Sequence, residues 1–156
     1  MATVKDWIEG ARLRTLSASI APVIAGTSVA LTHGYRQWLQ ACLALIVGLS
    51  LQIASNYSND YSDGIRGTDD NRTGPQRLTG GGLAKPQTVK YVAFFFYGLG
   101  ALAGFILIWS TGLWWLLSIG VFAILAAWFY TGGKHPYGYI GLGDVFVFIF
   151  FGLVAT

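Results

Sequence analysis

The chain of 156 residues is 54% apolar and only 11% charged, with a formal net charge of +3 and one cysteine. Soluble domains carry about 25% charged residues, so this composition favours a protein that has the lipid bilayer as its solvent. The lone cysteine excludes a disulfide scaffold, the 15% aromatic content excludes disorder, and the small positive charge gives no reason to expect a nucleic-acid partner.

Four long apolar runs predict an all-α, polytopic transmembrane helical bundle. A helix that crosses a hydrocarbon core of about 30 Å needs roughly 20 apolar residues. The runs are residues 16–32, 39–54, 89–109 and 113–130. The second run continues as a helix toward Asp63, and a fifth run begins near Leu142 and is still apolar at the last residue. We therefore expect four full spans plus the start of a fifth, in one transmembrane domain that belongs to a longer protein.

The distribution of Lys and Arg predicts the orientation of these spans. Nine of the ten basic residues fall in the N-terminal tail, in the long connection between the second and third spans, or after the fourth span. The first short loop has only Arg36, and the turn at residues 110–112 has none. Because basic residues mark the cytoplasmic side, we expect a cytoplasmic N-terminus in a multi-pass protein of the inner (plasma) membrane.

Two further patterns concern helix packing and the membrane interface. Gly100 and Gly104 form a small-x-x-x-small pair, which allows two helices to approach closely. Tryptophans fall at the predicted span ends, where amphipathic rings prefer the interface. These tryptophans are Trp38, Trp109, Trp114 and Trp115.

The segment with the most polar chemistry ends the second span. It reads Asn-Tyr-Ser-Asn-Asp-Tyr-Ser-Asp-Gly over residues 56–64. Asn56, Asp60 and Asp63 are spaced by four and three residues, which places them on one helix face. Neighbouring carboxylates repel each other unless a cation lies between them, and Mg²⁺ takes one or two carboxylates together with phosphate oxygens. The spacing indicates a Mg²⁺ site for a phosphate-bearing substrate, with a solvated loop of helix-capping acids as the alternative.

Several short motifs resemble those of a known family. Residues 59–64 resemble the first Asp-rich motif of the UbiA superfamily of intramembrane aromatic prenyltransferases. Flanking stretches resemble its menaquinone branch and keep the family's order along most of the chain. These stretches are residues 12–16, 21–22, 64–69, 74–78, 82–83, 130–132 and 141–144. One departure is Gly67, where the superfamily pattern has its last acid; the next acid, Asp69, follows two residues later.

The resemblance implies a fold of about nine helices with a second Asp-rich motif in the C-terminal half. Residues 1–156 would then be the N-terminal half, with residues 55–88 as a cytoplasmic Asp-rich motif and loop. The implied activity is Mg²⁺-dependent transfer of a polyprenyl group from polyprenyl diphosphate to 1,4-dihydroxy-2-naphthoate, which gives demethylmenaquinone. A C-terminal half or an oligomeric partner would complete the active-site cavity.

The same resemblance implies roles for individual side chains. The expected catalytic and Mg²⁺-binding residues are Asp60, Asp63 and Asn56, with Asn56 as a neutral ligand or orienting donor and Asp69 as a further candidate ligand. The basic candidates for binding the diphosphate are Arg12, Arg72, Arg77 and Lys134, and Arg12 is equally suited to the acceptor carboxylate. The rings expected to stabilise an allylic cation are those of Tyr57, Tyr61 and Tyr130.

Other functions remain open on these residues. Prenyl transfer to a different aromatic acceptor fits the same motifs. A CDP-alcohol phosphotransferase also uses Mg²⁺ and acids at membrane helix ends, but its Asp-Gly-x-x-Ala-Arg signature is absent after Asp63. A transporter or membrane-subunit fragment would bind ions through the acids, although a transporter usually places such residues near the membrane midplane.

Overall fold

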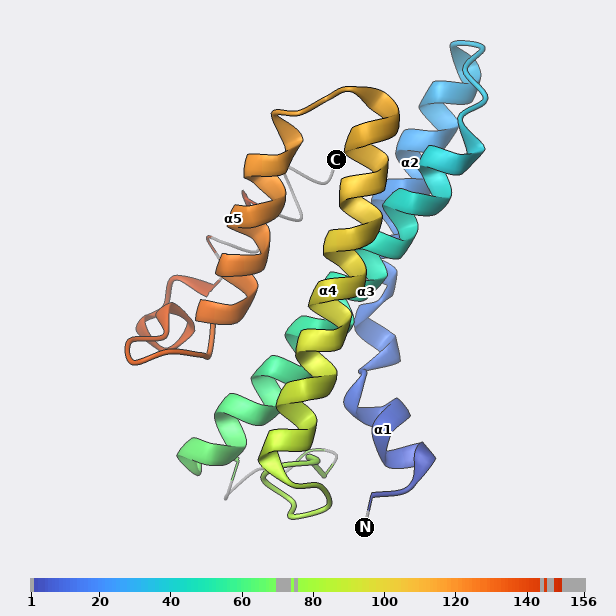
Figure 1. Cartoon of the computed structure of the whole chain (residues 1–156). Helices are drawn as coiled ribbons and strands as arrows, with labels where there is room; N and C mark the ends of the chain where they lie inside the picture. Colours follow the sequence, from blue (N-terminus) through green and yellow to red (C-terminus); the bar gives the residue numbers. More distant parts are fainter. Residues whose placement is uncertain (1, 70–73, 75, 144, 146–147, 150–156) are drawn as a thin grey trace.

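The computed structural model describes residues 2–69, 74, 76–143, 145 and 148–149, and these contain helices and no strand (Figure 1). The elements in chain order are α1 (Val4–Gly10), η1 (Leu13–Thr15), α2 (Ser17–Thr32), α3 (Trp38–Arg66), α4 (Pro86–Thr111), α5 (Leu116–Phe129) and η2 (Tyr137–Ile140). For this part of the chain, the predicted all-α class is confirmed.

Two helices are long and apolar enough to cross a membrane, α3 with 29 residues and α4 with 26. The segments Val4–Thr15 and Ser17–Thr32 make a third candidate if they form one span bent by 50°. Helix α5 has 14 residues, which is about 21 Å of helix and less than a core of about 30 Å. Length and composition thus support two or three of the four predicted spans, and the fifth falls largely outside the described residues.

Helix α5 is shorter than its apolar run because the run begins as a turn. Gly112 ends α4 in the left-handed region with φ 71°. The amide of Trp114 then donates to the carbonyl of Gly112 at 3.0 Å, and the amide of Leu116 donates to the carbonyl of Leu113 at 3.0 Å. These local bonds reverse the chain direction between α4 and α5, so the α-helix starts only at Leu116.

Helices α3 and α4 form the main packed pair (Figure 1). A Cβ atom on Gly100 would lie 3.3 Å from Cβ of Ser50 and 3.2 Å from Cδ2 of Leu51, and one on Gly104 would lie 3.6 Å from Cγ2 of Val47. The predicted small-residue pair therefore lies in the contact between the two helices. This contact places the polar end of α3 beside the first turns of α4.

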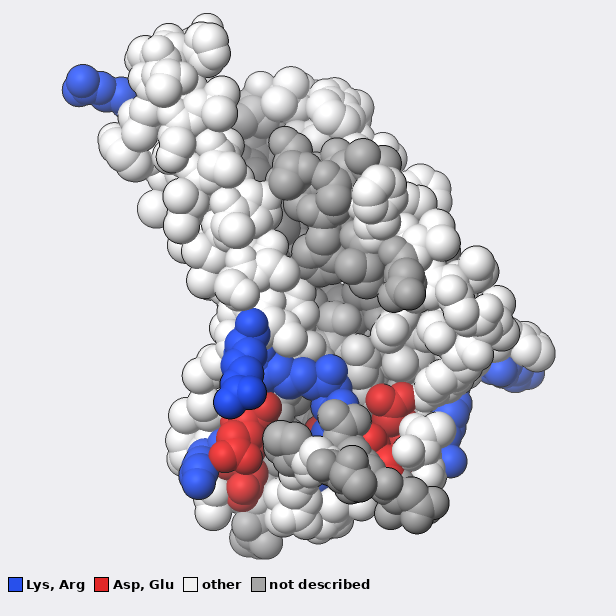
Figure 2. Space-filling model, turned by 180° about the vertical axis from the view of Figure 1, so that it is seen from behind, with Lys and Arg blue, Asp and Glu red and all other residues white. Residues whose placement is uncertain are grey.

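Charged residues gather at one end of the molecule (Figure 2). The N-terminal tail, the loop after α3 and the connection after α5 all lie at this end, whereas the turns before α3 and after α4 lie at the opposite end (Figure 1). Arg36 precedes α3 and is the basic residue at that far end. The segregation is what the orientation prediction requires, and the side of the membrane that each end faces stays a prediction.

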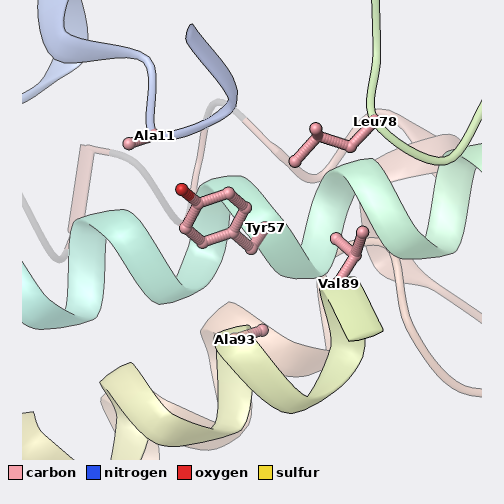
Figure 3. Close-up of a cluster of buried hydrophobic side chains, with 5 residues drawn as sticks. All are labelled: Ala11, Tyr57, Leu78, Val89 and Ala93. Carbon is pink, nitrogen blue, oxygen red and sulfur yellow. The ribbon is translucent and has the colours of Figure 1, made fainter. Parts of the chain in front are cut away.

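Hydrogen bonds from side chains of α3 fasten the N-terminal tail to this helix. The hydroxyl of Tyr57 donates to the carbonyl of Trp7 at 2.6 Å, and the amide nitrogen of Asn56 donates to the carbonyl of Ala11 at 2.8 Å. Between α1 and η1 the chain turns at Arg12, which has left-handed backbone angles with φ 54°. The tail, the loop after α3 and the start of α4 share one small core with α3. Figure 3 shows that core, which consists of Ala11, Tyr57, Leu78, Val89 and Ala93.

Candidate functional site

The last three turns of α3 bury polar side chains, which is uncommon for a helix end. The buried residues there are Asn56, Tyr57, Ser58, Asn59, Asp60 and Ser62. Burying a polar group is costly unless it is hydrogen-bonded, so the partner of each side chain indicates what that side chain holds in place.

Asp60 holds the loop that follows α3. Its side chain is fully buried, at 0% exposure. One carboxylate oxygen accepts a hydrogen bond from the amide of Leu78 at 3.0 Å, and the other accepts from the amide of Thr79 at 2.8 Å. One turn later, a Cβ atom on Gly64 would lie 2.4 Å from Cγ2 of Thr79 and 2.7 Å from the amide nitrogen of Gly80. The loop therefore lies directly on this face of α3.

The same loop brings two predicted site residues together. Nε of Arg77 lies 3.9 Å from Oδ1 of Asp69, and both side chains are buried. A Cβ atom on Gly80 would lie 2.8 Å from Cβ of Asp69, so the glycine lets the backbone approach this pair. Leu78, between Arg77 and Thr79, inserts into the core shown in Figure 3. Arg72, which was predicted to bind diphosphate, lies outside the described residues.

Asp63 faces η2, and Asn59 faces the connection between α5 and η2. The hydroxyl of Tyr139 donates to Oδ1 of Asp63, and the hydroxyl of Thr131 donates to Oδ1 of Asn59 at 2.8 Å. Asn59 and Asp63 are four residues apart and lie on one face of α3. Among the described residues, only one oxygen of the half-buried Asp63 carboxylate accepts a hydrogen bond.

Arg66 fastens this connection to the end of α3. Its guanidinium donates to the carbonyl of Thr131 and, at 2.5 Å, to the carbonyl of Gly133. It also lies 5.8 Å from the ring centroid of Tyr139. The exposed Lys134 follows Gly133 directly, so its backbone lies near this end of α3.

Asn56 connects α3 to the tail segment that carries Arg12. Its amide nitrogen donates to the carbonyl of Ala11 at 2.8 Å and to the hydroxyl of Thr15 at 3.0 Å, while Gln52 donates to its amide oxygen at 3.5 Å. These bonds hold the turn between α1 and η1, and with it the half-buried Arg12, against α3.

The three predicted tyrosines have three separate sets of neighbours. Tyr57 packs between Trp7 and Phe96, with ring centroids 5.7 and 6.2 Å away. Tyr61 stacks on Trp128 at 6.3 Å. Tyr130 meets the ring of Tyr137 edge-on at 5.5 Å. Each ring thus contributes to packing where it lies.

Two tyrosines after α5 have raised pKa values. Burial, and then the neighbouring phenol of Tyr130, raise the pKa of Tyr137 to about 12. Burial, and then the hydrogen bond to Asp63, raise the pKa of Tyr139. Both hydroxyls therefore stay protonated at neutral pH, and Tyr139 remains a hydrogen-bond donor to Asp63.

The donor set fits Mg²⁺ only if a substrate completes it. Within the described residues, no group of three or more His, Cys, Asp or Glu side chains could hold a metal ion. Mg²⁺ usually takes one or two carboxylates and receives its other ligands from water and substrate phosphates. Asp63, with the amide oxygen of Asn59 on the same face, is a set of this kind.

Sequence reasoning did not identify Asn59, Arg66 or Tyr139 as parts of this site. Asn59 had a usable signal, because it precedes Asp63 by the same four residues that separate Asn56 from Asp60. Arg66 and Tyr139 gave no usable signal in the sequence, because their hydrogen-bond partners lie more than 60 residues away in the chain.

Comparison with known proteins gives consistent matches. Residues 19–156 match the model of the UbiA prenyltransferase family. The 1,4-dihydroxy-2-naphthoate octaprenyltransferase of Mycobacterium tuberculosis is 52% identical over all of this chain and 53% of its own length. The Escherichia coli protein of that name is 40% identical, with the same coverage. UbiA prenyltransferase domain-containing protein 1 of Xenopus tropicalis is 31% identical over 91% of this chain and 41% of its length. The chain thus spans about half the length of these relatives, and no solved structure matches it.

Proposed function

The chain belongs to the UbiA prenyltransferase family, and we propose that it takes part in transferring a polyprenyl group from polyprenyl diphosphate to 1,4-dihydroxy-2-naphthoate. The product would be demethylmenaquinone, an intermediate of menaquinone biosynthesis. Relatives named 1,4-dihydroxy-2-naphthoate octaprenyltransferase match the whole chain, and this supports the choice of acceptor.

The observation that carries the proposal is the convergence of three separate segments on the polar end of α3. Asn56 holds the turn with Arg12, Asp60 holds the loop with Arg77, and Asn59 with Arg66 holds the connection with Lys134. Each segment brings one cation to the end of a helix that is otherwise apolar. A diphosphate on a long isoprenoid chain needs such a combination of cations and apolar surface.

We assign different tasks to the two acids of the motif. Asp63, together with Asn59, would hold Mg²⁺, which when bound supplies positive charge opposite the departing diphosphate. Asp60 would act as a positioning residue, because both of its carboxylate oxygens accept hydrogen bonds from backbone amides of the loop after α3. Asn56 would be an orienting donor, because its amide nitrogen already donates hydrogen bonds to Ala11 and Thr15 in the N-terminal tail.

The cationic side chains would bind the diphosphate and hold its charge as the allylic C–O bond breaks. Arginine suits this task because its guanidinium can bind two phosphate oxygens at once. Arg12 lies in the turn after α1, Lys134 lies in the connection after α5, and Arg77 lies in the loop after α3, where it pairs with Asp69. The apolar helices would exclude water from the allylic cation until the aromatic ring attacks.

We place the charged end of the molecule on the cytoplasmic side of the inner (plasma) membrane, with α5 as a further span. A second Asp-rich motif, from a C-terminal half or a partner, would face the first across the cavity.

The test is prenyl transfer by the intact protein in lipid vesicles. Radiolabelled polyprenyl diphosphate is supplied with 1,4-dihydroxy-2-naphthoate, with and without Mg²⁺, and the labelled product is separated by chromatography. We expect product only with Mg²⁺, and a loss of about 100-fold in the Asp63→Asn variant. Asp6→Asn is the matched control, because the half-buried Asp6 caps the start of α1 and accepts its hydrogen bonds from Thr3.

Two results would contradict the proposal. If the Asp63→Asn variant kept most of its activity, Asp63 would not be a ligand of the metal. Faster labelling of 4-hydroxybenzoate than of the naphthoate would assign the chain to a different acceptor.

A further inference from the structure

Lys90 lies among three aromatic rings where three helices meet. Its Nζ is 5.6 Å from the ring centroid of Tyr61 on α3, 5.9 Å from that of Phe94 on α4, and 5.9 Å from that of Trp128 on α5. The residue is half-buried in the second turn of α4, at the charged end of the molecule. The ammonium group therefore points into the protein rather than away from it.

This cation has no anionic partner within the part of the chain that the structure describes, where no carboxylate oxygen lies within 4.0 Å of its Nζ. Half-burial removes part of its hydration, and the ring faces offset only part of that loss. The start of α4 does not stabilise the positive charge of Lys90, because the N-terminal end of a helix itself carries partial positive charge. The site is thus electrostatically complementary to an anion.

An apolar groove begins at the same rings. It lies between α4 and α5, has a cavity volume of about 460 Å³, and is lined on the α4 side by Phe94, Tyr97 and Ala101 and on the α5 side by Leu125 and Trp128, among others. Phe94 and Trp128 are shared by the groove and the surroundings of Lys90. The cation therefore lies beside one end of this apolar groove.

The distance from Lys90 to the far end of the groove matches one membrane leaflet. Lys90 and Ala101 are separated by 11 residues, which is about 16 Å of helix, or half of a hydrocarbon core of about 30 Å. We propose that this groove binds an anionic membrane lipid, with its phosphate against Lys90 and one acyl chain between α4 and α5.

The proposed lipid site is separate from the diphosphate site. Tyr61 and Asp63 are two residues apart, so they point in nearly opposite directions from the axis of α3. Tyr61 contacts Lys90 and Trp128, whereas Asp63 contacts Tyr139. An anion at Lys90 is therefore on the other side of α3 from Asp63.

The first experiment tests the headgroup contact. The intact protein is taken from vesicles of phosphatidylglycerol and phosphatidylcholine, and native mass spectrometry counts the lipids that it retains. We expect a preference for phosphatidylglycerol that falls about fivefold in Lys90→Gln. Lys85→Gln is the matched control, because Lys85 is the exposed residue just before α4 and should leave the preference unchanged.

The second experiment tests the acyl-chain contact. Gly98 lines the groove, and a Cβ atom there would meet nothing within 4 Å, so the side chain of Gly98→Leu has room to start into the groove. Gly26 on α2 has the same open surroundings away from the groove, and Gly26→Leu is the control. We expect Gly98→Leu to lose the retained phosphatidylglycerol and Gly26→Leu to keep it.

Three results would overturn the proposal. These are an unchanged preference in Lys90→Gln, retained phosphatidylglycerol in Gly98→Leu, and displacement of the lipid by excess polyprenyl diphosphate, which would assign the groove to the substrate. If the Lys90→Gln variant fails to fold, the comparison of Gly98→Leu with Gly26→Leu still tests whether the groove binds the lipid. The readout is lipid binding, so it is independent of whether the prenyl-transfer proposal holds.

Discussion

Replacing Asp60 by Asn tests the positioning role of this residue without changing its size. The carboxylate accepts one hydrogen bond on each oxygen, from the amides of Leu78 and Thr79. An asparagine has one acceptor oxygen, so one of these amides would face an NH₂ group instead.

The expected weakening of the loop follows from the two bonds. A hydrogen bond to a charged group contributes about 1.5–3 kcal/mol, and a buried donor without a partner costs about 1–3 kcal/mol. Asp60→Asn removes the charge from both bonds and leaves one amide unpaired, so we expect a loss of about 3 kcal/mol in loop anchoring. This corresponds to roughly a 100-fold larger population with the loop detached.

Limited proteolysis measures that population directly. Arg77 is 9% exposed in the docked loop, so trypsin can cleave after it only when the loop opens. We expect cleavage at Arg77 to accelerate about 100-fold in Asp60→Asn. The exposed Lys134 supplies an internal reference whose cleavage should stay constant.

The same variant separates positioning from metal binding. Asp60→Asn should lower kcat and leave the Mg²⁺ concentration for half-maximal activity unchanged, whereas Asp63→Asn should raise that concentration. Unchanged cleavage at Arg77, or a higher Mg²⁺ requirement in Asp60→Asn, would refute the reasoning.

Two further predictions follow from the same end of the molecule. Gly64→Ala places a Cβ atom 2.4 Å from Cγ2 of Thr79, so it should expose Arg77 to trypsin as Asp60→Asn does, while Gly120→Ala, which meets nothing within 4 Å, should not. The pKa of Tyr139 is raised above its ordinary value of 10.0, so its bond to Asp63 should contribute fully to stability below pH 10 and lose that contribution as the pH rises through the folded-state pKa. The thermal-midpoint difference between wild type and Tyr139→Phe should therefore be constant from pH 7 to 9 and shrink above pH 10; a difference that already falls by pH 8 would contradict this.

The long helices could be predicted because their signals are local. The apolar runs at residues 39–54 and 89–109 locate α3 and α4, and the polar continuation toward Asp63 indicated that α3 extends past its apolar part. Helix α5 was overestimated because an apolar run does not reveal the turn made by Gly112 and Trp114. Hydropathy measures solvent preference and not backbone direction.

The division of roles within the Asp-rich motif could not be predicted, because it depends on distant partners. Asn56 with Asp60 and Asn59 with Asp63 are two equally spaced pairs, and each lies along a single helix face. They differ in what packs on each face, which is the tail and loop for the first pair and the connection after α5 for the second. Only the tertiary structure distinguishes a side chain that holds backbone from one that can hold a ligand.

The attachment of the N-terminal tail has a consequence for biosynthesis. The carbonyls of Trp7 and Ala11 accept hydrogen bonds from side chains that are translated 45 to 50 residues later. The first helix of the chain is therefore synthesised before the surface that it binds, and it can settle in place only after the polar end of α3 has been made.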